Sequence, residues 1–462
     1  MPDQPTPPAL HADLAVIGFG KGGKTLAGAL AKAGRRVVMI EQSAQMYGGT
    51  CINIGCVPTK ALVYRSEHPD PHLARDDGYR AAFAFTTTLV EAMRAKNFAL
   101  LDTPETATVL TGRAEFTDPH TLLVTAGDDR RTVTSDTIVI DTGAEPVLPP
   151  IPGLAGSAHV VTSTGLLARA ERPRSLVVLG GGYVAVELAS MHAAFGTPTT
   201  LLQRSDRLLR AEDPDISHAV EDLLSGVGVR ILAGVTVDGV ADTADGATVT
   251  FIGPDGPGSV MGDVVLAALG RRPVTAGLGL DRVGIAVDAH GAVVVDEHLR
   301  TGQPHVFAVG DVNGGPRHPY VSLAGYRVVL DPLTRQGRRT TRDRDAVPHT
   351  VFTTPPLGRV GMTEDQARAT GRAVRVAVRH VADMATVPRA KIVGDARGLM
   401  KAVVDAETDE VLGVAILAHD AQEIVNTVAL AMRLRATAST LRDGIWTLPS
   451  MTEALNDLFG SL

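Results

Sequence analysis

Short apolar runs bounded by glycine or polar residues alternate with Ala- and Leu-rich stretches along the first part of the chain. Such apolar runs are typical of buried strands, and the stretches between them have the length and composition of helices. This alternation predicts βαβ units on a parallel sheet. The strand, helix and strand of the first unit are residues 14–17, 25–32 and 36–40, and those of the second are residues 175–179, 184–194 and 199–202.

The last part of the chain, from about residue 347, has a different pattern. Short strands such as 399–404 and 413–417 mix with amphipathic helices, and residues 363–366 fit a capping box. Residues 146–153 and 334–348, rich in proline and in arginine respectively, have the composition of linkers. The sequence therefore predicts an α/β protein with two Rossmann-like dinucleotide-binding domains and a C-terminal α+β domain.

Composition narrows the range of functions. A length of 462 residues suggests about three domains. Lys and Arg number 44 against 51 Asp and Glu, so the formal charge of −7 does not favour nucleic acid or an anionic membrane as a partner. No apolar run approaches the roughly 18 residues of a membrane helix. Residues 1–13 lack the basic and apolar regions of a signal peptide, so we expect a cytoplasmic protein.

The first βαβ unit carries a dinucleotide fingerprint. Gly18, Gly20 and Gly23 form G-x-G-x-x-G directly after the first strand, and Glu41 follows the second strand. Small residues let backbone N–H groups approach a pyrophosphate at the start of the helix. The acidic residue can accept a hydrogen bond from a ribose hydroxyl.

The second unit repeats the fingerprint with a different ending. Gly180, Gly182 and Ala185 form G-x-G-x-x-A, but the following strand leads into Arg204 and, further on, Arg210. A guanidinium at this place suits a 2′-phosphate, and the missing carboxylate removes a repulsive charge. We therefore assign FAD to the first unit and NADPH to the second.

The two cysteines of the chain, Cys51 and Cys56, lie close together after the first unit. Two thiols separated by four residues, one of them glycine, can close a small ring, and a helix N-terminus favours the thiolate. No metal site is expected, because a zinc site needs more ligands than two cysteines without a nearby histidine pair. Buried structural thiols are the alternative.

A later apolar strand ends in Gly310 and Asp311. A carboxylate at this place can meet a sugar or ribityl hydroxyl. An ordinary turn aspartate is the alternative.

In their order along the chain, these motifs resemble those of the pyridine nucleotide–disulfide oxidoreductases of the glutathione reductase and dihydrolipoamide dehydrogenase class. The resemblance covers essentially the whole chain, and in detail it is to the reactive-chlorine-resistance flavoprotein branch. The C-terminal cysteine pair of the related mercuric reductases is absent, which argues against mercury as the substrate. The motifs are residues 18–23, 48–60, 180–187, 310–311 and 448–453, and those typical of the branch are residues 18–25, 46–53, 355–363 and 455–459.

The resemblance implies a division into domains and a homodimer. FAD would be bound by residues 1–150 together with a return segment, 281–346, and NADPH by residues 151–280. Residues 347–462 would form the dimerisation domain, so that each active site borrows C-terminal residues from the partner chain.

It also implies roles for individual residues. Cys56 would be the flavin-side charge-transfer thiol, and Cys51 the interchange thiol that meets the acceptor. Lys60 would pair with Glu187 near the flavin, and Tyr183 would be a lid that NADPH displaces. The remaining cofactor-binding positions that it implies are Gly49, Thr50, Gly143, Gly270, Asp311, Arg204 and Arg210.

One departure from the family pattern concerns proton transfer. The family has His-Pro-x-x-x-Glu near its C-terminus, whereas this chain has Leu448 in place of the histidine and keeps Glu453. That histidine is the acid–base partner of the interchange thiol, so efficient turnover of a thiol disulfide is in doubt. Glu453 is either a catalytic residue or a helix cap within Ser450–Glu453. His318 could carry the proton instead, although a surface or packed histidine is the plainer interpretation.

The sequence thus predicts an enzyme in which electrons pass from NADPH through FAD and the Cys51–Cys56 pair to an acceptor. Oxidants, quinones, a metal ion such as Cu(II) and disulfides are the candidate acceptors. One alternative is a biosynthetic dithiol oxidase that uses O₂ through FAD. Another is a non-catalytic flavin redox sensor. The presence of Tyr183 and Arg204 speaks against both, because neither needs an NADPH site.

Overall fold

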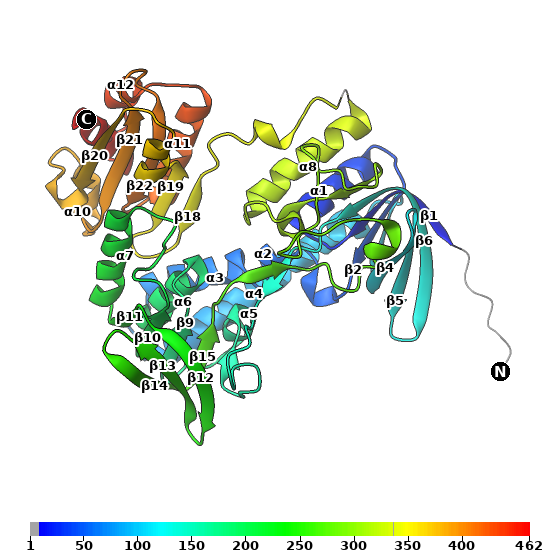
Figure 1. Ribbon diagram of the computed structural model, residues 1–462, viewed down its shortest axis with the longest axis horizontal. Helices are drawn as coiled ribbons and strands as arrows, with labels where there is room; N and C mark the ends of the chain where they lie inside the picture. The colour runs from blue at the N-terminus through cyan, green and yellow to red at the C-terminus, as the bar shows by residue number, and fades with distance from the viewer. Residues whose placement is uncertain (1–8, 336) are drawn as a thin grey trace. The chain divides into compact units, whose positions relative to one another are not determined.

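The computed structural model describes residues 9–335 and 337–462, and it has two compact units (Figure 1). Unit 1 contains residues up to 58, 84–147 and 271–344. Unit 2 contains residues 59–83, 148–270 and 345–462. Helices α3 (Cys56–Glu67) and α4 (Arg75–Asp102) contribute residues to both units.

Unit 1 is built on a seven-stranded sheet in the order β3-β2-β1-β6-β5-β4, with β17 paired to β6. Strands β3, β2, β1, β6 and β17 are joined by parallel pairings, while β4, β5 and β6 form an antiparallel meander. The bounds are β1 Leu10–Ile17, β2 Val37–Glu41, β3 Ala107–Thr111, β4 Arg113–Asp118, β5 Thr121–Ala126, β6 Asp129–Ile140 and β17 Val306–Ala308. A separate antiparallel pair joins β7 (Ala144–Pro146) to β16 (Arg271–Pro273).

Both faces of this sheet are buried at its central strand β1. Leu14 and Val16 of β1 belong to a core that includes Leu26 and Val328, from helices α1 (Lys21–Lys32) and α8 (Pro319–Thr334). Figure 1 shows these two helices together at the sheet. Ile17 belongs to the core on the other face, because successive side chains of a strand alternate in direction. Burial on both faces explains why the strand reads as a continuous apolar run.

Helix α1 begins at Lys21, earlier than the sequence predicts. A Cβ atom on Gly22 would lie 2.7 Å from the carbonyl oxygen of Ser322, and one on Gly23 would lie 2.6 Å from the Val16 side chain. These glycines allow the first turn to pack closely. Tertiary contact therefore outweighs the low helix propensity of glycine here.

The half of unit 2 that carries the second glycine loop is built on a parallel five-stranded sheet in the order β11-β10-β9-β15-β8. Helix α6 (Tyr183–Ala194) joins β9 to β10, as the second βαβ unit predicts. The other bounds are β8 Val160–Val161, α5 Ser163–Leu167, β9 Leu176–Leu179, β10 Thr199–Gln203, α7 Pro214–Gly226, β11 Val229–Ala233 and β15 Val264–Ala267. An antiparallel sheet contains β12 Thr236–Thr243, β13 Gly246–Gly253 and β14 Gly256–Gly262.

The C-terminal half of unit 2 is an antiparallel sheet in the order β18-β19-β22-β21-β20, accompanied by helices. The capping box predicted at residues 363–366 is present, since Thr363 Oγ1 accepts from Gln366 N at 3.1 Å and Gln366 Oε1 accepts from Thr363 N at 3.0 Å. The bounds are β18 His349–Val351, β19 Leu357–Gly361, α9 Glu364–Ala369, β20 Val374–His380, α10 Pro388–Ile392, β21 Leu399–Asp405, β22 Val411–Leu417, α11 Ala421–Arg433, α12 Ala438–Arg442 and α13 Ala454–Gly460.

One core cluster joins the two halves of unit 2. It contains Val186 of α6 and Val178 of β9 together with Val351, Leu357 and Leu417 of the C-terminal sheet. The C-terminal sheet is therefore packed against the helix that begins at the second glycine loop.

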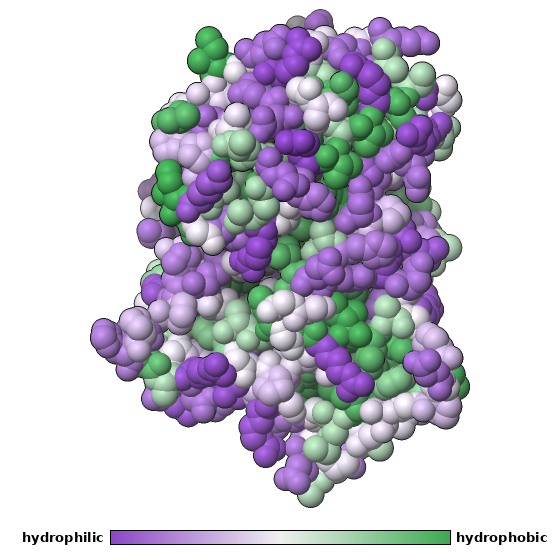
Figure 2. All heavy atoms as spheres, turned by 90° about the vertical axis from the view of Figure 1, so that its left-hand side faces the viewer, coloured by the Kyte–Doolittle hydropathy of each residue, from purple (hydrophilic) through white to green (hydrophobic). Residues whose placement is uncertain are grey.

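The surface of the molecule is mixed in character. Hydrophilic residues occupy much of the face drawn in Figure 2, with apolar side chains exposed between them. Across the described residues, 9–335 and 337–462, we find no helix that is both long enough and apolar enough to cross a membrane. The four-part division into domains remains a prediction.

Candidate active site

The first glycine loop is closely packed around a buried carboxylate. Gly20 is the N-cap of α1, and a Cβ atom there would lie 2.5 Å from Asp141 Oδ2. Gly18 has a φ of +96°, and Gly23 N donates a hydrogen bond of 2.6 Å to Asp141. No larger side chain fits at Gly18 or Gly20 without moving this carboxylate or the backbone beside it.

Glu41 ends β2 beside this loop. Its carboxylate accepts hydrogen bonds from Phe19 N at 3.0 Å and from Ser43 N at 3.2 Å. Burial raises the pKa of Glu41, and these backbone hydrogen bonds partly oppose the shift. The buried carboxylate at the strand end is the acceptor that a ribose hydroxyl requires.

The sequence analysis missed two charged residues in this region. Asp141 is fully buried, and burial raises its pKa well above the usual range. The Lys24 ammonium donates to Gly48 O at 2.8 Å, and burial lowers the pKa of Lys24 to about 8, opposed in part by the charge of Cys51. Lys24 lies within residues 18–25, one of the motifs that carry the family resemblance. Its sequence neighbours, however, do not distinguish it from an exposed lysine.

Both cysteines lie at the starts of helices and are partly buried. Cys51 is the second residue of α2 (Thr50–Asn53), and Cys56 is the first residue of α3. A Cβ atom on Gly55 would lie 3.0 Å from Thr50 O and 3.5 Å from Cys51 Cα. The chain between the cysteines therefore folds back on itself, and glycine is needed at the closest approach.

The cysteine segment is also packed against the first glycine loop. Gly49, with a φ of +81°, lies so close to Gly20 that a Cβ atom on Gly49 would be 3.0 Å from Gly20 Cα. Unit 1 thus brings Gly49, Thr50 and Cys51 to the start of α1. This juxtaposition could not be read from the sequence, because it depends on how the loop returns to the sheet.

Two residues of unit 1, Tyr320 of α8 and Arg271 of β16, interact electrostatically with Cys56, and His318 directly precedes α8. Burial raises the pKa of Tyr320, and the negative charge of the Cys56 thiolate raises it further. Burial lowers the pKa of Arg271, and the negative charges of Asp311 and Cys56 oppose this shift. The ring of His318 stacks on that of Tyr320, with centroids 5.0 Å apart and planes at 5°. The predicted proton carrier therefore contacts a residue that interacts electrostatically with Cys56.

Asp311 lies on the short helix Gly310–Asn313 after β17. Burial raises its pKa, and Arg271 and Arg317 oppose that shift. A Cβ atom on Gly310 would lie 2.9 Å from Asp141 Oδ1, so the Gly310–Asp311 turn meets the first glycine loop. The structure thus gathers these motifs of unit 1 around one buried region.

The second glycine loop, in unit 2, is more open. A Cβ atom on Gly180 would lie 2.5 Å from Ala268 O, but one on Gly182 would meet nothing within 4 Å. A Cβ atom on Gly143 or Gly270 would also meet nothing within 4 Å. Both glycines have a positive φ, +72° at Gly143 and +117° at Gly270. After β10, Arg204 and Arg210 are exposed, and within the described chain neither forms an ion pair with an acidic side chain. Their guanidinium groups are available to an anion.

Lys60 and Glu187 form the ion pair that the resemblance implies. Lys60 Nζ lies 2.6 Å from Glu187 Oε2 and 4.9 Å from the centroid of the Phe352 ring. Glu187 Oε1 accepts from Phe352 N at 2.9 Å. Lys60 also lies one helical turn after Cys56 on α3, whereas Glu187 belongs to α6.

The C-terminal motif has the local structure of a helix cap. Glu453 ends the short helix Met451–Glu453, and its Oε2 accepts from Ser450 N at 3.0 Å. Leu448, at the position of the family's histidine, is 68% exposed. The cap contact gives Glu453 a structural role, and its catalytic role stays a prediction.

Two family descriptions match most of the chain. One, the pyridine nucleotide-disulphide oxidoreductase family, matches residues 12–325. The other, the dimerisation domain of pyridine nucleotide-disulphide oxidoreductases, matches residues 347–459. The chain belongs to this family. The predicted family, the oxidoreductase class and the α/β fold with a C-terminal dimerisation domain are confirmed, and a flavin cofactor is supported.

Characterised members of the family are similar to the chain over nearly its whole length. The probable pyridine nucleotide-disulfide oxidoreductase RclA of Escherichia coli is 44% identical, over 96% of this chain and 98% of the relative. A mercuric reductase of Streptomyces lividans is 36% identical over 96% and 94%, and a dihydrolipoyl dehydrogenase of Mycobacterium bovis is 32% identical over 98% of each.

A solved structure described as the Cu(II) complex of the HOCl-induced flavoprotein disulfide reductase RclA from E. coli is also similar. It has a TM-score of 0.91 and 43% sequence identity, and the match covers 97% of this chain and 99% of that one. The resemblance to the reactive-chlorine-resistance branch is thereby supported at the level of fold and sequence.

Proposed function

We propose that this protein is an NADPH-dependent FAD oxidoreductase that passes electrons through Cys51 and Cys56 to a small acceptor. The observation that carries the proposal is the packing of the cysteine segment on the first glycine loop, where Gly49 meets Gly20. A thiol pair next to a dinucleotide loop can exchange electrons with the group bound there.

The residues of unit 1 fit FAD. Glu41 supplies a buried carboxylate acceptor for hydroxyl groups, and Asp311 supplies a half-buried one. The start of α1 supplies backbone N–H groups for a pyrophosphate. When bound, FAD would take a hydride from NADPH and transfer two electrons to the disulfide. The chain would bind and orient this group through Gly18, Gly20 and Asp311.

The residues of unit 2 fit NADPH. Gly182 leaves room for a pyrophosphate at the start of α6, and Arg204 and Arg210 can pair with a 2′-phosphate. Lys60, held by Glu187, keeps a positive charge near one end of the thiol helix. The preference for NADPH over NADH follows from the two arginines.

The redox step balances on the two sulfur atoms. A disulfide between Cys51 and Cys56 takes two electrons and two protons to give two thiols. Two Cu(II) ions can then each take one electron, which restores the disulfide and releases two protons to solvent. In this step no leaving group needs a proton, whereas a disulfide acceptor must protonate a departing thiolate.

We therefore favour a metal ion or another oxidant over a thiol disulfide as the acceptor. Leu448 cannot donate the proton that a thiol-disulfide acceptor requires. The relative RclA is described as HOCl-induced and as forming a Cu(II) complex, which agrees with this class of acceptor. A homodimer is expected from the dimerisation domain, and the reducing cytoplasm suits a thiol pair that must cycle.

An acceptor screen tests the proposed function. We expect NADPH-driven reduction of Cu(II) or quinones by the holoenzyme to exceed that of glutathione disulfide and lipoamide by at least about 10-fold, because acid catalysis typically contributes about 100-fold or more. Efficient turnover of glutathione disulfide together with no reduction of metals or quinones would contradict the proposal.

His318 is the proposed proton carrier, in place of the family's histidine at the position that Leu448 occupies here. Replacing it, His318→Ala, should lower the rate of NADPH oxidation by about 10-fold and change its pH profile, since the general acid–base group that carries the proton would be lost. His298→Ala, in the same unit and outside the cysteine region, is the matched control. An unchanged pH profile for His318→Ala would contradict this role.

A further inference from the structure

Tyr183 stands at the start of the helix that follows the second glycine loop. It is the first residue of α6 and comes directly after Gly182, whose missing Cβ would face open space. Backbone N–H groups at such a helix start are the binding site for a pyrophosphate. A nucleotide bound there therefore has Tyr183 as a neighbour.

The Tyr183 hydroxyl is held by two groups from other segments of unit 2. It donates to Glu212 Oε1 at 3.2 Å and lies 3.0 Å from His349 Nε2. His349 Nε2 is in turn 3.3 Å from the same carboxylate oxygen. Glu212 precedes α7 in the half of unit 2 that carries the second glycine loop, whereas His349 begins β18 in the C-terminal half. The three groups form a closed triangle across the two halves.

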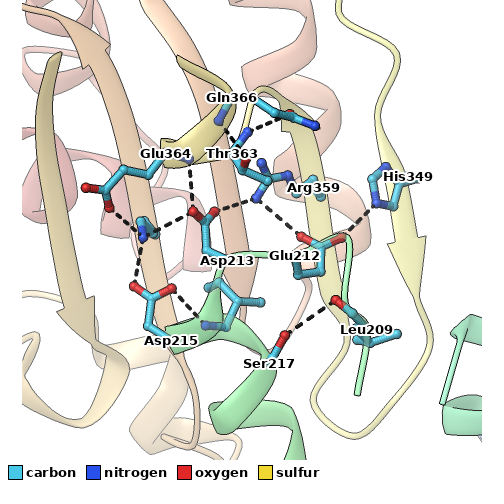
Figure 3. A network of polar contacts seen from close by, with 12 residues as sticks. Leu209, Glu212, Asp213, Asp215, Ser217, His349, Arg359, Thr363, Glu364 and Gln366 are labelled. Atoms are coloured by element: carbon cyan, nitrogen blue, oxygen red, sulfur yellow. Dashed lines mark hydrogen bonds and ion pairs between the residues drawn. The ribbon is translucent and has the colours of Figure 1, made fainter. Parts of the chain in front are cut away.

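Glu212 cannot easily move, because it belongs to a buried ionic network. Its side chain is 2% exposed, and Arg359 Nη1 lies 3.3 Å from Oε2 and 3.0 Å from Asp213 Oδ2. Figure 3 shows the Glu212 carboxylate between Arg359 and His349. The C-terminal half supplies both of these groups, from β19 and β18.

A second buried cation extends the network. Lys401 Nζ, 5% exposed, lies 3.4 Å from Asp213, 3.0 Å from Asp215 and 2.9 Å from Glu364. Removing one partner from such a buried network leaves a charge without compensation, so its members hold each other in place. The Glu212 carboxylate is therefore a fixed support for Tyr183.

We propose that Glu212 and His349 are positioning residues that hold Tyr183 across the second nucleotide site and set the affinity of that site for NADPH. This inference rests on the proposed function and on the role that the family resemblance implies for Tyr183, the lid that the nucleotide displaces. Entry of the nucleotide then breaks the contacts of the hydroxyl with Glu212 and His349. The C-terminal half, through His349 and Arg359, thus acts on nucleotide binding within one chain.

The consequence is a competition between the lid and the nucleotide. If the site is open for only a fraction of the time, the apparent dissociation constant rises by the inverse of that fraction. Loss of the hydroxyl's two hydrogen bonds should therefore tighten NADPH binding by about 5- to 10-fold. A contact with only a structural role would lower stability without tightening binding.

The test uses the holoenzyme and three variants. Tyr183→Phe keeps the ring and removes the hydroxyl, and His349→Leu removes the Nε2 contact. His349→Gln restores an N–H donor and should return the affinity toward the wild-type value. His159→Leu is the matched control, because His159 is a half-buried histidine of unit 2 that contacts Asp263 O at 3.1 Å and lies outside the triangle.

Binding is measured by calorimetry with NADP⁺, and the KM for NADPH and kcat are measured in turnover. We expect Tyr183→Phe and His349→Leu to lower the dissociation constant and KM by about 5- to 10-fold, and the double variant to gain no more than either. If both variants bind NADP⁺ as the wild type does, the positioning role is wrong.

If the wild type itself does not bind NADP⁺, the proposed function fails at its nucleotide step, which is a separate outcome. If His349→Leu does not fold, Tyr183→Phe alone decides, because removing one hydroxyl oxygen leaves the packing of the ring intact. Weaker binding by Tyr183→Phe would also overturn the proposal.

Discussion

The two glycine loops share a backbone plan and differ in what surrounds them. In unit 1, Asp141 fills the space beside Gly20, and the neighbouring carboxylate of Glu41 is buried. In unit 2, Gly182 faces open space, and the arginines that follow β10 are exposed. A closed, buried loop suits a group that stays bound, whereas an open loop with available cations suits a nucleotide that is exchanged in every turnover. The same motif can therefore serve a resident cofactor and a substrate.

The largest effect is expected where the loop is closed. Gly20→Ala would bring a Cβ within 2.5 Å of the Asp141 carboxylate, so the start of α1 must shift. We expect the flavin content of the purified protein to fall by more than about 100-fold, in line with the upper range of the cost of overpacking. The flavin absorbance per protein measures this effect.

Gly28→Ala is the matched control for that substitution. Gly28 lies on the same helix, and a Cβ atom there would meet nothing within 4 Å. It should keep its flavin and be stabilised slightly, because alanine favours a helix interior. Equal flavin loss in both variants would contradict the prediction, because the loss would then come from a change in α1 and not from the close contact at Gly20.

The next effect concerns the cations of the open loop. Arg204→Glu should lower kcat/KM for NADPH by about 100-fold and leave that for NADH within about two-fold, because it replaces a charge-assisted contact with repulsion. Arg230→Glu makes the same charge change at an exposed position on the neighbouring strand β11 and should alter neither value. A parallel loss with both nucleotides would contradict selection of the 2′-phosphate.

Much of both loops could be predicted from the sequence because their chemistry is local. The glycines, the strand end at Glu41, the arginine that follows β10 and the cysteine spacing lie in short segments whose geometry follows from backbone sterics. Asp141 and Lys24 could not be predicted, because their importance arises from burial among segments distant in the chain. The start of α1 at Lys21 was missed for the same reason.

The triangle of Tyr183, Glu212 and His349 could not be predicted from the sequence either. Its members are separated by 29 and 137 positions, and no periodic pattern links them. Packing of the C-terminal sheet on α6 brings them together.

A smaller effect is expected where the loop is open. Gly182→Ala puts a methyl group into open space, and the φ of −84° at this position is permitted to alanine. The protein should fold and keep its flavin, while the KM for NADPH rises by about 10-fold because the methyl group meets the pyrophosphate. Gly226→Ala, also in open surroundings at the end of α7, should leave KM unchanged. Loss of flavin in Gly182→Ala would contradict the distinction between the loops.

The smallest effect is a change in the pH dependence of stability. Burial raises the pKa of Glu41 above its ordinary value of 4.5, so the folded protein keeps a proton that the unfolded chain has lost. Stability therefore falls as pH rises between the two pKa values. Glu41→Gln does not titrate, so its stability relative to wild type should increase as the pH rises. Melting temperatures across pH 4 to 8 measure this trend, and a difference that is constant with pH would contradict it.

The most direct test of the central claim is an anaerobic titration of the holoenzyme with NADPH. If Cys51 and Cys56 form a disulfide that receives electrons, the wild type consumes two equivalents of NADPH per chain, whereas Cys51→Ser consumes one. Uptake of a single equivalent by both proteins would contradict the account, because the thiol pair would then lie outside the path of the electrons.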